Sequence, residues 1–133
     1  AWAAGPAAYR GISVPGFPNL FLMLGPNTGT GHTSVLIPIE AQARYAANCI
    51  RQLRREGATS MDVRDEAYSH DDTATQSRLR GTAWASSRCT SWYKTAEGRI
   101  LAIYPGFISE YALGMRRIRW KDYRIESTED KGG

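Results

Sequence analysis

Hydrophobic and polar positions divide the first half of the chain into an apolar run, a glycine-rich loop and a long segment with helical spacing. The apolar run, Leu20 to Leu24, is hydrophobic on both faces and ends at Gly25-Pro26, which predicts a central parallel strand covered on both sides. From about Thr33 to Glu56, apolar residues recur at steps of three and four, and Gly57 supplies a stop. This pattern predicts one amphipathic helix whose buried stripe is Leu36, Ile39, Ala43, Ala46, Ile50 and Leu53.

The remaining segments are shorter. Residues 1–19 are rich in glycine and proline, which predicts an irregular lead-in with a short extended piece from Tyr9 to Val14. Further along, we expect a strand at Met61 to Arg64, a polar helix from Ser69 to Gly81, a hairpin from Trp84 to Tyr104 that turns at Thr95 to Gly98, a brief helix from Ser109 to Met115, a last strand from Trp120 to Ile125, and a fraying tail to Gly133. The predicted class is α/β, with one long helix on a small sheet plus a hairpin and short helices.

Composition indicates one globular domain. The 133 residues include 42% hydrophobic and 23% charged side chains, and no apolar run approaches the ~18 residues that a membrane span needs, so no membrane partner is predicted. Ala1 to Pro6 has neither an initiator Met nor a signal-peptide layout, so the chain reads as a piece of something longer. Cys49 and Cys89 make no disulfide framework, which favours a reducing, cytoplasmic location.

The excess of basic residues that gives the net charge of +4 is concentrated in two groups. Three arginines, Arg51, Arg54 and Arg55, fall at the end of the predicted long helix, where cations complement the helix dipole. A second group surrounds Trp120. Because no recognised nucleic-acid module surrounds either group, we interpret both as solvated surface and predict no nucleic-acid partner.

The glycine-rich loop matches the common phosphate-binding motifs poorly. Aligned as a P-loop, it has Pro26 at the first glycine position and His32 in place of the lysine. Aligned as a dinucleotide fingerprint, Gly29 and Gly31 fit but Ser34 replaces the third glycine. A loop that merely joins a strand to a helix is a further interpretation. Nevertheless, a helix N-terminus after a strand presents unpaired N–H groups and a positive dipole end, so we expect a ligand there.

Other reactive side chains carry little signal. Cys89 has no histidine or basic partner near it in sequence, and His70 beside Asp71 and Asp72 is typical of a solvated helix start. Two histidines with scattered carboxylates are too few for a metal site, and no residue is assigned a catalytic role.

Several blocks together resemble a known family. The longest is GFPNLFLMLGPNTGTGHTSVLIPIEAQARY, from Gly16 to Tyr45. The shorter ones are Trp2, Gly5, Tyr9-Arg10-Gly11, Trp84, Cys89 to Tyr93, Gly98-Arg99, Tyr104-Pro105-Gly106 and Asp122-Tyr123. Nearly the whole chain resembles the C-terminal part of class B FAD-dependent flavoprotein monooxygenases, the Baeyer-Villiger enzymes, in their 4-hydroxyacetophenone monooxygenase-like branch.

That resemblance implies a C-terminal fragment of a flavoprotein with two dinucleotide-binding folds, in which the segment from Gly25 to Val35 passes beside the flavin ring. The cofactor-binding residues it implies are Gly25, Pro26, Asn27, Thr28, His32, Thr33, Ser34 and Val35. For His32, a loop side chain without a role in proton transfer is the favoured interpretation. Trp92, Tyr93 and Tyr104 correspond to the substrate side, and ordinary packing in the hairpin core explains them equally well.

By the same resemblance, residues 1–57 would end the FAD-binding domain and residues 58–133 would supply substrate-side loops, hairpin and tail. The implied reaction uses FAD and NADPH to insert one oxygen atom from O₂ into a small-molecule ketone or a sulfide. Both glycine fingerprints for these cofactors are missing from the 133 residues, so we expect the chain alone to be inactive.

Two other functions remain open from the sequence. The glycine-rich loop and the positive charge suit a stand-alone anion- or nucleotide-binding module. Alternatively, the chain is a structural fragment that self-associates, because the stripe from Leu36 to Leu53 would lack its natural cover.

Overall fold

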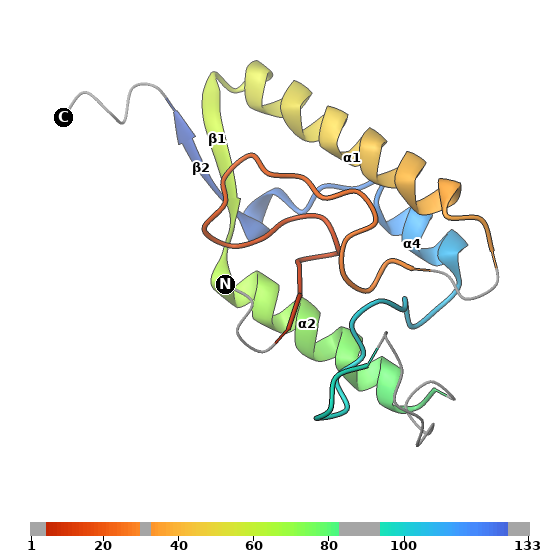
Figure 1. Ribbon diagram of the computed structural model, residues 1–133. Coiled ribbons are helices and arrows are strands. Elements are labelled where there is room, and N and C mark those ends of the chain that lie inside the picture. The colour runs from red at the N-terminus through yellow and green to blue at the C-terminus, as the bar shows by residue number, and fades with distance from the viewer. Residues whose placement is uncertain (1–4, 30–32, 83–93, 128–133) are drawn as a thin grey trace.

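The computed structural model describes residues 5–29, 33–82 and 94–127. Its elements are α1 (Leu36–Arg55), β1 (Ala58–Val63), α2 (Asp65–Arg80), α4 (Ile108–Gly114), a 3₁₀ turn (Trp120–Asp122) and β2 (Tyr123–Ser127). α1 and α2 lie on opposite sides of the irregular N-terminal segment, with the two strands at one end and α4 at the other (Figure 1). The predicted mixture of helices with a small sheet is confirmed.

The long helix forms where the sequence predicts it, as α1. Ser34 Oγ accepts the N–H of Leu36 at 3.2 Å at its start. Gly57, at φ +64°, follows its end and donates its N–H to the carbonyl of Arg54 at 3.3 Å. Both features satisfy backbone groups that a helix end leaves without partners.

The predicted buried stripe of α1 is wrong apart from Leu53. Leu36 is 63% exposed and Ile50 is 50% exposed. The face that packs inward is Pro38, Ala41, Gln42, Tyr45, Cys49 and Leu53. This face also follows steps of three and four, but it includes a proline and a glutamine. Counting apolar residues alone missed it, because Gln42 can be buried only where its amide finds partners.

The predicted strand at Leu20 to Leu24 is also wrong. Within the described residues the sheet consists of β1 and β2, paired antiparallel with Val63 opposite Tyr123 and Met61 opposite Ile125. Neither strand is extended by the apolar run, whose Leu20 and Leu24 are exposed. Leu24 has φ +51°, outside the extended region, so the run cannot continue as a strand there.

The N-terminal segment is core rather than lead-in. Tyr9 to Val14 is a tight turn and not the extended piece that was predicted, since the N–H of Tyr9 bonds the carbonyl of Ser13 at 2.8 Å. Tyr9 and Ile12 are buried with α1, β1 and α4 in the main hydrophobic cluster. The Tyr9 hydroxyl donates to Asp122 at 2.7 Å, which ties this turn to the segment before β2.

The shorter elements follow the predictions with shifted ends. α2 begins earlier than Ser69 and ends at Gly81 as expected, and α4 covers most of the helix expected from Ser109. The last strand begins at Tyr123, after the 3₁₀ turn. The predicted hairpin turn at Thr95 to Gly98 is confirmed, with Lys94 bridging to Ile100. The other hairpin arm, residues 84–93, and most of the tail lie outside the described residues.

Among the residues that the structure describes, no helix combines the length and the hydrophobicity needed to cross a membrane.

Candidate functional site

Backbone hydrogen bonds join residues 27–29 of the glycine-rich loop to residues 101–104. The N–H of Asn27 donates to the carbonyl of Leu101 at 2.9 Å, and the N–H of Gly29 donates to the carbonyl of Ala102 at 2.8 Å. In return, the N–H of Tyr104 donates to the carbonyl of Gly29 at 3.0 Å. These bonds resemble a short piece of parallel sheet and hold residues 27–29 of the loop in place.

Two of the predicted cofactor-binding side chains are used inside the protein. Asn27, at φ +58°, donates its amide to the carbonyls of Ile100 and Ile103 at 2.8 and 3.1 Å. Thr28 is fully buried, and its hydroxyl donates to the carbonyl of Gly25 at 2.7 Å. Both side chains therefore stabilise the loop backbone from within the protein.

The loop glycines are required by contacts within the chain. A Cβ on Gly25 would lie 2.1 Å from the carbonyl oxygen of Gly11, and one on Gly29 would lie 2.6 Å from the carbonyl oxygen of Ala102. Either distance is far below van der Waals contact. Glycine at these two positions therefore follows from internal packing, and it does not by itself indicate a ligand.

The outer side of the loop borders an apolar pocket of about 600 Å³. Its lining is Pro6, Leu22, Met23, Leu24, Gly25, Pro26, Gly29, Val35, Leu101 and Ala102. Met23, Leu24 and Val35 are exposed in it, which is unusual for side chains of this kind clustered on one surface. Here Gly25, Pro26 and Val35, three of the predicted cofactor residues, lie together.

The pocket lies beside the start of α1. Thr33 and Ser34 are exposed there, and the first turn of α1 contains no acidic side chain. The helix therefore presents its positive dipole end without a local carboxylate to offset it. An apolar hollow beside such an end suits a flat, hydrophobic group that carries partial negative charge, so the residues present fit a flavin ring. His32 lies outside the described residues.

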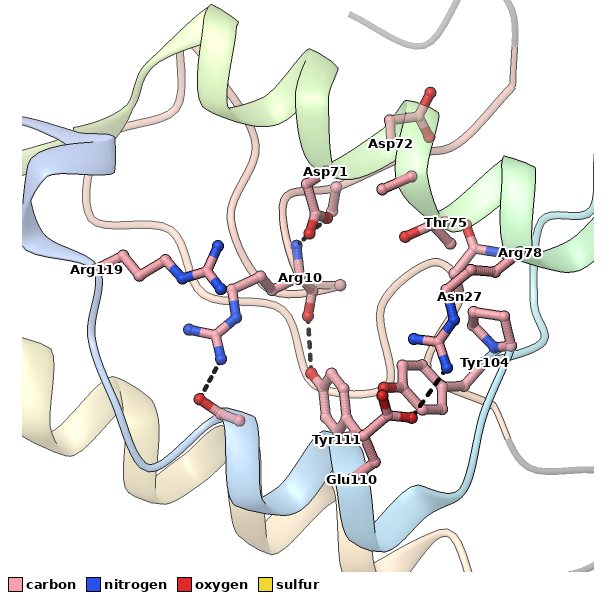
Figure 2. Close-up of a pocket in the computed structure, with 15 residues that line it drawn as sticks. Arg10, Asn27, Asp71, Asp72, Thr75, Arg78, Tyr104, Glu110, Tyr111 and Arg119 are labelled. Carbon is pink, nitrogen blue, oxygen red and sulfur yellow. Dashed lines mark hydrogen bonds and ion pairs between the residues drawn. The ribbon is translucent and has the colours of Figure 1, made fainter.

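A second hollow, a polar cleft of about 270 Å³, lies between the N-terminal turn, α2 and α4 (Figure 2). Six charged residues line it: Arg10, Asp71, Asp72, Arg78, Glu110 and Arg119. Arg78 pairs with Glu110 at 3.0 Å and lies over the ring of Tyr104, 5.9 Å from its centroid. Tyr104, predicted for the substrate side, is thus placed beside Asn27 on this cleft. Trp92 and Tyr93 lie outside the described residues.

Most charged groups of the cleft already have partners within the protein. Burial raises the pKa of the Asp71 carboxyl, while the N–H of Arg10, bonded to it at 2.8 Å, acts in the opposite direction. Asp72 holds Arg99 through two hydrogen bonds. The guanidinium of Arg10 donates to the carbonyls of Gly114 and of Arg117, the latter at 2.9 Å, at the end of α4. A cation there complements the helix dipole.

Sequence reasoning missed this cleft. Arg10 appeared only within a matching block, and Asp71 and Asp72 were interpreted as a helix start. The partners lie far apart in sequence, so no local spacing predicts them. The available signal was that Asp71 and Asp72 fall on the partly buried face of α2 that ends at Leu79, which helix periodicity could have suggested once the true start at Asp65 was known.

The sequence and the fold of the chain are both similar to those of known proteins. No protein-family model matches the chain. A Baeyer-Villiger monooxygenase of Streptomyces coelicolor is 38% identical over 125 residues, covering 93% of this chain and 24% of the relative. A second Baeyer-Villiger monooxygenase, from Pseudomonas aeruginosa, is 33% identical over 128 residues. The chain is homologous to Baeyer-Villiger monooxygenases. A third relative, an FAD-binding monooxygenase of Aspergillus niger, is 34% identical over 96% of this chain.

Solved Baeyer-Villiger-type structures share the fold. A steroid monooxygenase crystallised with NADP superposes with a TM-score of 0.78 at 25% identity over 95% of this chain. A structure of OTEMO in complex with FAD and NADP superposes with a TM-score of 0.79 at 21% identity, which shows the fold alone. The resemblance drawn from sequence is confirmed. The chain spans about a quarter of the length of these relatives.

Proposed function

We propose that this chain is the C-terminal part of an FAD- and NADPH-dependent monooxygenase that inserts one oxygen atom from O₂ into a ketone or a sulfide. In that enzyme, the chain contributes the loop from Gly25 to Val35 and the N-terminus of α1 to the flavin site. The homology to Baeyer-Villiger and FAD-binding monooxygenases supports the activity, and about three quarters of such an enzyme would come from outside this chain.

The observation that carries the proposed site is the apolar pocket on the outer side of the loop, beside the start of α1. FAD would supply the electron transfer and oxygen chemistry when bound. The chain's own residues do three things: Met23, Leu24 and Val35 exclude water, the hydrogen-bonded loop forms one wall of the pocket, and the N-terminus of α1 favours negative charge on the ring. Thr33, Ser34 and His32 would complete the wall at the helix start.

A stand-alone anion-binding module has less support. The surface in front of α1 is apolar, and two arginines of the polar cleft already have partners: Arg78 is paired with Glu110, and Arg10 donates to carbonyls at the end of α4. Self-association of the separate chain and a cytoplasmic location stay predictions, as does the division of the chain at residue 57.

A chimeric enzyme tests the proposal. The matching quarter of the Streptomyces coelicolor relative is replaced by this chain, and bound flavin is measured by visible absorbance. We expect a folded protein that retains FAD and oxidises NADPH faster when a ketone is added. A folded chimera without flavin would contradict the proposal.

A pair of variants then tests the pocket in the same chimera. Val35→Glu puts a carboxylate where the flavin ring would carry negative charge, so we expect FAD affinity to fall by roughly tenfold. Val35→Gln has nearly the same shape without the charge and is the matched control. Equal affinities for the two variants would place the ring away from Val35.

A further inference from the structure

Building on the proposed function, we propose that Gln42 and Tyr111 are positioning residues for the flavin-facing loop. Gln42 projects from α1 and Tyr111 from α4. Together they hold the backbone at Leu24, which enters the loop, against the N-terminal turn at Arg10. Neither side chain lines the apolar pocket, so both would act on the flavin only through the loop.

Three hydrogen bonds in series carry the proposal. The N–H of Leu24 donates to Gln42 Oε1 at 2.8 Å, and Gln42 Nε2 donates to the hydroxyl of Tyr111 at 3.1 Å. The Tyr111 hydroxyl donates in turn to the carbonyl of Arg10 at 2.8 Å, as Figure 2 shows. Every step has a defined direction, because the amide of Gln42 uses its oxygen for the loop and its nitrogen for the tyrosine.

The burial of the two side chains makes this series sensitive to change. Gln42 is 0% exposed and Tyr111 is 6% exposed. A buried amide or hydroxyl that loses its partner cannot turn to water, so the remaining groups would have to move to find new partners. The loop end of the series has the least packing around it, since Leu24 is 41% exposed, so it is the part that we expect to move when a hydrogen bond is lost.

The backbone at Leu24 needs such a restraint. Its φ of +51° lies in the left-handed region, which is costly for a residue with a Cβ. The conformation turns the Leu24 side chain into the apolar pocket, where it forms part of the lining. Without the hydrogen bond that the Leu24 N–H donates to Gln42, the backbone could relax to an ordinary φ and the wall of the pocket would change.

The other side of the same backbone is fixed by packing. Gly25 lies so close to Gly11 that a Cβ on it would come within 2.1 Å of the Gly11 carbonyl oxygen. Gly11 follows Arg10, whose carbonyl receives the Tyr111 hydroxyl. The series therefore closes on itself: Leu24 and Gly25 are held between Gln42 on one side and the Arg10-Gly11 turn on the other.

A second buried tyrosine in the same core, Tyr45, offers a matched control substitution. The Tyr45 hydroxyl is bonded to the hydroxyl of Tyr123 at 2.7 Å, and Tyr45 is 0% exposed. Tyr45→Phe removes a buried hydroxyl and its hydrogen bond to Tyr123 and makes no change at the loop, whereas Tyr111→Phe removes a buried hydroxyl with hydrogen bonds to Gln42 and Arg10. A purely structural role for Tyr111 predicts that both variants lower the melting temperature and that neither changes FAD binding or exchange at Leu24.

The test uses the chimera described above with three variants: Tyr111→Phe, Gln42→Met and Tyr45→Phe. Melting temperature, the FAD dissociation constant and hydrogen–deuterium exchange of peptides containing Leu24 are measured for each. We expect all three variants to melt at lower temperature. Only Tyr111→Phe and Gln42→Met should weaken FAD binding, by about three- to tenfold, and speed exchange at Leu24.

Two outcomes would overturn the inference: unchanged FAD binding and exchange in Tyr111→Phe, or an equal loss of FAD binding in Tyr45→Phe. The failure of the proposed function looks different. In that case the unsubstituted chimera folds without FAD, while exchange at Leu24 in the variants still decides whether Gln42 and Tyr111 hold the loop.

Discussion

Gly11→Ala should lower the free energy of unfolding by about 4 kcal/mol, whereas Gly57→Ala should lower it by only about 1 kcal/mol. The two glycines have nearly the same backbone, with φ of +70° and +64°. They differ in how much room surrounds them. A Cβ on Gly11 would lie 2.0 Å from Thr28 Cγ2, whereas one on Gly57 would meet nothing within 4 Å. The difference between the variants is therefore the cost of overlap at the loop.

Thr28 has little room to move away from a larger residue at position 11. It is fully buried, and its hydroxyl is bonded to the carbonyl of Gly25. Urea unfolding of the two variants and the unsubstituted protein measures the effect. If both variants lose the same stability, the close packing of the N-terminal turn against the loop is wrong.

Raising the pH from 9 to 12 should lower the free energy of unfolding by several kcal/mol. Burial raises the pKa of the Cys49 thiol from 9.0 to about 12 and that of the Tyr123 hydroxyl from 10.0 to about 12. Burial also raises the pKa of Tyr9, Tyr45 and Tyr111. A group whose pKa is higher in the folded state contributes its full stability below the unfolded pKa and loses it as the pH rises through the folded pKa.

For Cys49 alone, the shift of three units corresponds to about 4 kcal/mol, lost across this range. Urea unfolding at pH 8, 10 and 11 measures the decline, and Cys49→Ala should flatten its first part. A free energy of unfolding that stays constant from pH 8 to 11 would mean that these groups are not buried as described.

Local patterns predicted the elements whose causes are local. α1, its stop at Gly57 and the end of α2 at Gly81 follow from spacing and from glycine at helix ends. The same patterns failed where distant groups decide. The inward face of α1 depends on Gln42 finding Leu24 and Tyr111, and a count of apolar residues carries no information about those partners.

Only the local part of the candidate site was predicted from the sequence. The resemblance located the loop, and the structure adds that Gly25, Pro26 and Val35 share one apolar pocket. The apolar run before it was predicted as a strand because it has the composition of one, yet in the described part of the chain the sheet is formed by β1 and β2 without it. The polar cleft depends on Arg10 meeting Asp71 across 61 positions, a contact that only the folded chain defines.

The most direct test of the central claim is a crystal structure of the FAD-loaded chimera. The account predicts that the flavin ring contacts the loop from Gly25 to Val35 on its apolar side, with the start of α1 directed at the ring. A ring bound elsewhere, with the pocket formed by Met23, Leu24 and Val35 left without it, would contradict the account.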